Sequence, residues 1–128
     1  METYVSIWQE YLKKTWGIAE EFSRKAALLI LYFAYYGIRF SITCGYRDDK
    51  FQAELIRRYN AGEPGIYKPA PVGKSLHNAT DFFGNPASLA LDISTSNFSL
   101  AGQIAKALGL HWGGEGDPVH FALRSGAL

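Results

Sequence analysis

The sequence predicts an α+β fold in which a small antiparallel sheet is backed by helices. Apolar residues recur at helical spacing through most of the first third of the chain. Three short segments instead alternate between apolar residues and small or polar ones, which is typical of strands. The chain has 128 residues, of which 48% are hydrophobic and 15% aromatic, enough for one hydrophobic core but not for two. We therefore expect residues 1–128 to form a single domain.

Two helices are expected before the first strand. The first has apolar residues at helical spacing, namely Val5, Trp8, Leu12 and Trp16. The second has a stronger series in steps of three and four, namely Ala19, Phe22, Ala26, Leu29, Phe33 and Tyr36. Gly37 follows where a left-handed C-terminal cap belongs. The second helix is expected in the core, whereas residues 1–18 carry no functional motif and are a candidate accessory arm.

The middle of the chain predicts a strand, a helix and a loop. The strand covers residues 38–44 and places one set of residues on a single face, namely Ile38, Phe40, Ile42 and Cys44. Asp48 or Asp49 can cap the following helix, which Gly62 and Pro64 would end. One side of that helix carries Phe51, Gln52, Leu55 and Tyr59. Residues 61–73 are rich in proline and glycine, which indicates an ordered loop.

The last third predicts two strands separated by a helix over about 99–108, closed by Gly109. In the strand over 89–94, Leu91 and its apolar neighbours face one way and Asp92 faces the other. In the strand over 119–123, Phe121 faces the core and His120 the opposite side. Asp92 and His120 thus project from the less apolar strand faces beside small residues, which leaves space for a ligand over the sheet.

Charge and composition exclude several classes of function. Thirteen Lys and Arg against twelve Asp and Glu give a net charge of +1, so no overall field attracts nucleic acid or an anionic membrane. The longest apolar run, Ala26 to Tyr36, is shorter than the about 20 residues of a membrane-spanning helix. The first residues do not read as a signal peptide. The single Cys44 excludes an internal disulfide and a multi-cysteine metal site, and we expect it to be a small buried hydrophobe.

Two histidines and one aspartate form a candidate metal site, namely His77, Asp92 and His120. Two imidazoles and a carboxylate can hold zinc and leave a fourth position for water, whose pKa then falls to about 7. Non-haem iron uses the same ligand types. The separation of fifteen residues between His77 and Asp92 and the helices of the first half disfavour iron.

Five motifs occur in one order along the chain: Gly45-Tyr46-Arg47 followed by Gln52, Ser75-Leu76-His77, Ala90-Leu91-Asp92, Trp112-Gly113-Gly114, and Asp117-Pro118-Val119-His120-Phe121. In type and order they resemble the zinc-dependent D-alanyl-D-alanine carboxypeptidases and L-alanyl-D-glutamate endopeptidases that cut peptidoglycan stem peptides, in particular the short phage endolysin and prophage members. The resemblance covers roughly residues 23–123. It implies a hedgehog/DD-peptidase-like fold and Zn²⁺ held by His77, Asp92 and His120.

The resemblance also implies that Asp117 is the general base and acid. Because Pro118 and the preceding glycines favour a turn, Asp117 can reach the metal-bound water although it lies three residues before His120. Such proton transfer contributes about 10²–10⁴-fold to a rate. Glu115, in the same glycine-rich segment, is the rival base.

Four further residues are expected around the substrate. Arg47 suits a developing oxyanion or a substrate carboxylate, the alternative being a surface arginine paired with a neighbouring aspartate. Gln52 is expected to point into the same pocket or to face solvent. The Ser75 hydroxyl can bind a substrate carboxylate or carbonyl. Trp112 is expected to form a wall of the cleft rather than to fill the core.

One feature departs from the family pattern. The family places the first histidine and the aspartate closer together than the fifteen residues found here, as if a loop had been inserted between Ala79 and Ser88. We therefore expect Asp92, and not the loop residue Asp81, to be the ligand. Phe82 and Phe83 of that loop are candidates for a lip of the substrate cleft.

These expectations favour an L-alanyl-D-glutamate endopeptidase of the endolysin type. A D-alanyl-D-alanine carboxypeptidase is the nearest alternative, and a non-catalytic zinc-containing module that binds peptidoglycan or belongs to a virion is the alternative from another class. We expect a monomer whose partner is the peptidoglycan stem peptide. Synthesis in a bacterial cytoplasm, with action on the cell wall after holin-type release or virion delivery, is the expected localisation.

Overall fold

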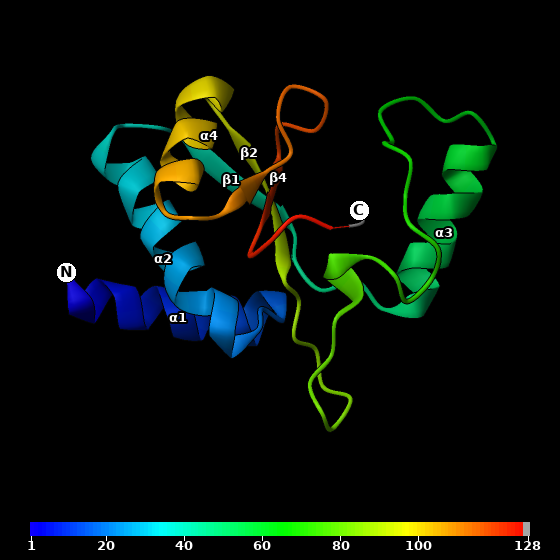
Figure 1. Cartoon of the computed structure of the whole chain (residues 1–128), viewed down its shortest axis with the longest axis horizontal. Coiled ribbons are helices and arrows are strands. Elements are labelled where there is room, and N and C mark those ends of the chain that lie inside the picture. Colours follow the sequence, from blue (N-terminus) through cyan, green and yellow to red (C-terminus); the bar gives the residue numbers. More distant parts are fainter. Residues whose placement is uncertain (127–128) are drawn as a thin grey trace.

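An antiparallel sheet with strand order β1-β2-β4-β3 organises the computed structural model, which describes residues 1–126 (Figure 1). Within that range the elements are α1 (Glu2–Trp16), α2 (Glu20–Tyr35), β1 (Phe40–Cys44), α3 (Asp49–Asn60), the 3-10 helix η1 (Leu76–Asn78), β2 (Ala90–Thr95), α4 (Phe98–Ala107), β3 (His111–Trp112) and β4 (His120–Ala122). This confirms the α+β fold. None of these helices is both long and apolar enough to cross a membrane.

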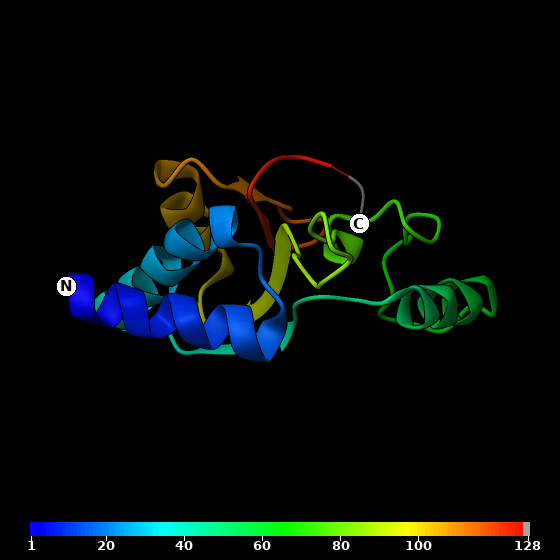
Figure 2. The same ribbon diagram turned by 90° about the horizontal axis from the view of Figure 1, so that it is seen from below.

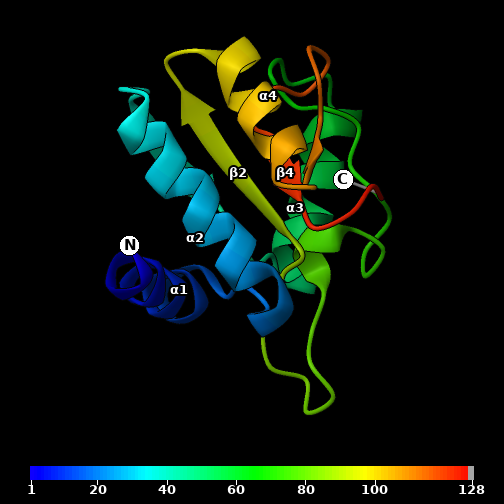
Figure 3. The ribbon, with the colours of Figure 1, turned by 60° about the vertical axis from the view of Figure 1, so that its left-hand side comes forward.

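The core lies where α2 and α4 cover one face of the sheet (Figure 3). Phe33 of α2 contacts Phe121 of β4 with ring centroids 5.9 Å apart, and both side chains are fully buried. Burial of each such side chain contributes about 1.5–3 kcal/mol. Val5 and Leu12 of α1 belong to the same core, so α1 is part of the folded body and not an accessory arm.

The structure corrects three details of the sequence-based expectations. Tyr36 is exposed, because α2 ends at Tyr35 and Gly37 turns the chain with a φ of 69°. The last strand, β4, spans only His120–Ala122, and Val119 beside it is only partly buried. The strand β3 was not expected, since two residues are too few to show a strand period.

Helix α3 stands apart from the α1–α2 side of the molecule (Figure 2). The Asp48 carboxylate caps it by accepting a hydrogen bond from the Phe51 N–H at 2.7 Å, as one of the two expected caps. Gln52 is the buried residue of α3, whereas Phe51 and Tyr59 are exposed. The side of α3 that carries these residues therefore lies outside the hydrophobic core under the sheet.

The segment 79–88 forms the expected loop. Thr80 and Pro86 bridge its two limbs, and Asp81 accepts hydrogen bonds from two backbone N–H groups at the tip. Phe82 and Phe83 are 96% and 84% exposed. The loop extends away from the sheet and from α3 (Figure 1).

Candidate metal centre

Adjacent strands bring Asp92 and His120 together. The two residues are direct partners in the antiparallel pairing of β2 with β4, and Asp92 Oδ1 lies 3.5 Å from His120 Nδ1. The helix η1 adds His77, whose Nε2 lies 3.3 Å from the same Asp92 oxygen. Both histidines are buried. The three expected ligands are therefore neighbours, and Asp81 lies in the exposed loop instead.

Polar atoms without partners gather at this point. Within residues 1–126, six buried side-chain nitrogen or oxygen atoms have no hydrogen-bond partner. Five of the six belong to this cluster, namely His77 Nε2, Asp92 Oδ1, Asp117 Oδ1 and both ring nitrogens of His120. A buried polar atom without a partner costs about 1–3 kcal/mol, so five in one place require an explanation.

A metal ion would give these atoms a partner. Around a tetrahedral zinc ion with ligand distances of about 2.0–2.1 Å, neighbouring ligand atoms lie about 3.3–3.4 Å apart. The separations of 3.3 Å and 3.5 Å from Asp92 Oδ1 to the two imidazole nitrogens match that spacing. The residues present therefore fit zinc.

The backbone around η1 fixes the orientation of His77. Its Nδ1 lies 2.7 Å from the carbonyl oxygen of Gly45. Because a carbonyl only accepts, Nδ1 carries a proton, and this contact turns Nε2 of the ring toward Asp92. Ser75 caps η1 by accepting a hydrogen bond from the His77 N–H, and it does not line the cavity at the centre. Ser75 thus fixes the backbone that carries His77.

Arg47 orients the Asp92 carboxylate. Its Nη2 donates to Asp92 Oδ2 at 3.1 Å, which leaves Oδ1 directed at the histidines. Burial opposes ionisation of Asp92, but the adjacent imidazoles of His120 and His77 and the guanidinium of Arg47 hold its pKa below the usual range. The partner of Arg47 is Asp92, and not an aspartate beside it in sequence. The guanidinium also lines the cavity.

Gln52 holds Arg47 in place. Its side chain is buried, accepts a hydrogen bond from Arg47 Nη1 at 3.4 Å and donates to the carbonyl of Ala70 at 2.9 Å. Gln52 thereby joins α3 to the loop before η1. It is neither a solvent-facing glutamine nor part of the cavity lining.

Asp117 lies in the expected turn, at the edge of the cavity. Burial raises its pKa, and the negative charge of Asp92 raises it further. Gly113 permits this turn, because a Cβ at that position would lie 2.3 Å from the backbone oxygen of Asp117. Glu115 is exposed and does not line the cavity, whereas Asp117 does.

The pKa of His77 and the burial of Cys44 both differ from what these residues show in a plain hydrophobic core. Burial acts against protonation of His77, but the adjacent Asp92 carboxylate and Cys44 sulfur raise its pKa to about 9. Cys44 is only partly buried, and its sulfur accepts a hydrogen bond from Arg47 Nε at 3.3 Å. The expectation of a buried apolar cysteine is wrong, because the sequence does not reveal that β1 ends at this cluster.

The Trp112 side chain packs against the hydrophobic core and not against the cavity. Its indole contacts the hydrophobic core and faces Gly102 of α4, and its Nε1 donates to the carbonyl of Pro118 at 2.9 Å. It does not line the cavity, so the expected cleft wall is not provided by Trp112. The ring instead anchors the turn that carries Asp117.

The cavity at the centre has a volume of about 180 Å³. Besides the charged residues and histidines, it is lined by Leu55, Gly65, Ile66, Tyr67, Pro69 and Val119. The sequence indicated an ordered loop over 61–73, but its pattern did not show that this loop folds back over the site. Phe82 and Phe83 do not line the cavity, so they form no lip there.

Comparison with known proteins adds no family assignment: no protein-family model matches the chain, and no curated protein matches it.

Proposed function

We propose that this protein is a zinc-dependent peptidase that hydrolyses an amide bond in peptidoglycan stem peptides, with the L-alanyl-D-glutamate bond as the favoured target. The observation that carries the proposal is the convergence of unpartnered buried atoms from His77, Asp92, His120 and Asp117 on one cavity. The motif order described above supplies the substrate class.

His77, Asp92 and His120 would hold the ion. Zinc supplies Lewis acidity, which polarises a carbonyl and makes a bound water acidic at neutral pH. Three protein ligands leave a position for water or substrate, as catalytic rather than structural zinc sites do.

Asp117 handles the protons in this proposal. Its Oδ1 is buried and has no hydrogen-bond partner among the described residues. Its raised pKa allows the carboxylate to accept a proton from water and to return one to the leaving amine. Asp117 therefore combines the position and the proton affinity of a general base and acid.

Arg47 and the 61–73 loop bind the substrate. The described hydrogen bonds engage Nε, Nη1 and Nη2 of Arg47, three of its five N–H groups. A remaining N–H can donate to the scissile carbonyl or to a substrate carboxylate, since the guanidinium lines the cavity. Ile66, Tyr67 and Pro69 supply the apolar wall against which a stem-peptide side chain can pack.

Digestion of purified peptidoglycan, followed by mass spectrometry of the products, tests the proposal. Zinc-loaded protein should release a new D-glutamate amino group, whereas chelated protein should release none. Asp117→Asn keeps the side-chain shape and should lower the rate about 10²–10⁴-fold. Glu115→Gln is the matched control in the same turn and should retain the rate.

Other products separate the alternatives. Released D-alanine without a new D-glutamate amine would identify a carboxypeptidase and reject the endopeptidase. Stoichiometric zinc without cleavage of any peptidoglycan bond would reject catalysis in favour of a cell-wall-binding or virion module.

A further inference from the structure

Cys44 lies beside the proposed metal ligands. The sulfur of Cys44, one ring nitrogen of His77 and one carboxylate oxygen of Asp92 all lie within 4.8 Å of one another. His77 is fully buried, and its Nε2 has no hydrogen-bond partner in the described part of the chain. The sulfur therefore lies beside two residues that each carry one buried atom without a hydrogen-bond partner, His77 Nε2 and Asp92 Oδ1.

A β-bulge creates this placement. The pairing of β1 with β2 is regular up to Ile42 opposite Ile93, and then shifts so that Cys44 lies opposite Asp92. The extra residue, Thr43, is exposed. Bulges beside functional sites re-aim side chains, and this one brings Cys44 alongside the ligand carboxylate.

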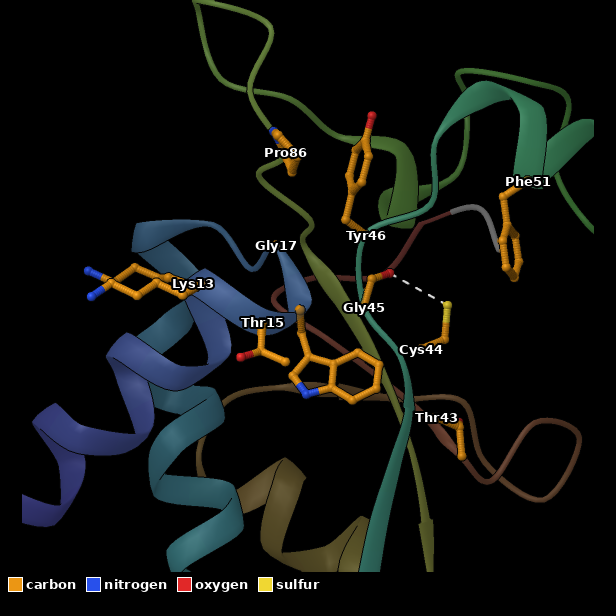
Figure 4. A pocket seen from close by; sticks show the side chains of 11 residues that line it. Lys13, Thr15, Gly17, Thr43, Cys44, Gly45, Tyr46, Phe51 and Pro86 are labelled. Carbon is orange, nitrogen blue, oxygen red and sulfur yellow. Dashed lines mark hydrogen bonds between the residues drawn. The ribbon is translucent and has the colours of Figure 1, made fainter.

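The surroundings leave the sulfur available as a ligand. The sulfur accepts one hydrogen bond, from Arg47 Nε at 3.3 Å. The Cys44 S–H donates only a weak hydrogen bond, with Sγ 3.6 Å from the Gly45 carbonyl oxygen (Figure 4). Cys44 also lines a separate cavity of about 550 Å³ beside Trp16, Tyr46 and Phe51, from which an ion or a reagent can reach it.

We propose that Cys44 is a metal ligand, so that His77 and Asp92 belong to two overlapping donor sets, one completed by His120 and one by the Cys44 thiolate. The inference rests on the metal centre of the proposed function. On ligation the thiol proton passes to solvent, because the thiolate is the ligating form. Thiolate is a soft donor, so this set selects thiophilic ions such as Cd²⁺ and does not favour Mg²⁺ or Ca²⁺.

Absorption spectroscopy of the metal-loaded protein tests the inference directly. Metal-free protein is titrated with Co²⁺ and, separately, with Cd²⁺, and the thiolate-to-metal charge-transfer band is recorded. Because the chain contains one cysteine, any such band comes from Cys44. The band should saturate at one equivalent in the wild type, disappear in Cys44→Ser and persist in His120→Ala. Cd²⁺ affinity should fall at least about tenfold in Cys44→Ser.

Alkylation of the wild-type protein provides a test that needs no variant. Bound Cd²⁺ should slow the reaction of Cys44 with iodoacetamide at least about tenfold, whereas Mg²⁺ should not.

Three results overturn the inference. One equivalent of bound Co²⁺ without a charge-transfer band, or unchanged alkylation in the presence of bound Cd²⁺, would show that Cys44 does not ligate. If peptidoglycan cleavage persists in either case, only this inference fails. If no metal binds, the proposed function fails with it.

Discussion

A methyl group at Gly113 should displace the residues that perform the proposed chemistry. A Cβ there would lie 2.3 Å from the backbone oxygen of Asp117 and 3.0 Å from Cβ of His120. Ordinary contact begins near 3.4 Å, so the Asp117 carbonyl must move by about 1.1 Å. In Gly113→Ala one small change thus disturbs the proposed base and one proposed metal ligand together.

The magnitudes follow from that displacement. Overpacking of this kind costs about 1–3 kcal/mol of unfolding free energy. A misplacement of about 1 Å in a catalytic group costs about 10²-fold in rate. Gly113→Ala should therefore unfold earlier in denaturant and cleave peptidoglycan about 10²-fold more slowly, and it should also bind zinc more weakly.

Gly116→Ala is the matched control for this prediction. Gly116 belongs to the same turn and does not have a positive φ, and a Cβ added there would meet no atom within 4 Å. The change should leave both rate and zinc affinity intact and should not reduce stability by more than about 0.5 kcal/mol. Equal behaviour of the two variants would refute the placement of Asp117 and His120 around Gly113.

Three further predictions concern the surroundings of the metal. Because the pKa of His77 is raised to about 9 in the metal-free protein, zinc binding at pH 7 should release at least about one proton. Zinc affinity should therefore rise about tenfold per pH unit toward pH 9. Calorimetry in buffers of different ionisation enthalpy measures the number of protons released, and a zinc affinity that does not change with pH would contradict the prediction. Arg47→Ala removes the hydrogen-bond partner of Asp92 Oδ2 and should weaken zinc binding about 10–100-fold, as measured by competition with a chelator. Replacement of a surface arginine by alanine should leave zinc affinity unchanged. Phe82→Ser and Phe83→Ser should leave the cleavage products unchanged by mass spectrometry, since neither residue lines the cavity; altered products would place that loop at the substrate.

The sequence was sufficient to predict that Asp92 and His120, two of the proposed ligands, lie on strands. The alternation around Asp92 and His120 placed each on the less apolar face of a strand, and the structure adds that they are direct partners on adjacent strands. Periodicity specifies a face but not a strand order, so it could not show that Arg47 would pair with Asp92 across the sheet.

The parts that sequence reasoning missed depend on long-range packing. The sequence left open whether Gln52 of α3 points into the pocket or faces solvent, yet in the structure it is buried and bonds Arg47 and the loop before η1. Helical periodicity is the same whether a helix covers a sheet or borders a cavity. Likewise, a single β-bulge moved Cys44 to the ligand cluster, and nothing in the local pattern of residues 38–44 indicates that bulge.

Titration of zinc into the metal-free protein, with the rate of stem-peptide cleavage followed at each step, tests the central claim most directly. The rate should be zero without zinc, rise with bound zinc and saturate at one equivalent per chain. Asp117→Asn should bind the same single equivalent and stay at least about 10²-fold slower. Cleavage by fully metal-free protein, or one bound equivalent with no cleavage in the wild type, would contradict the proposal.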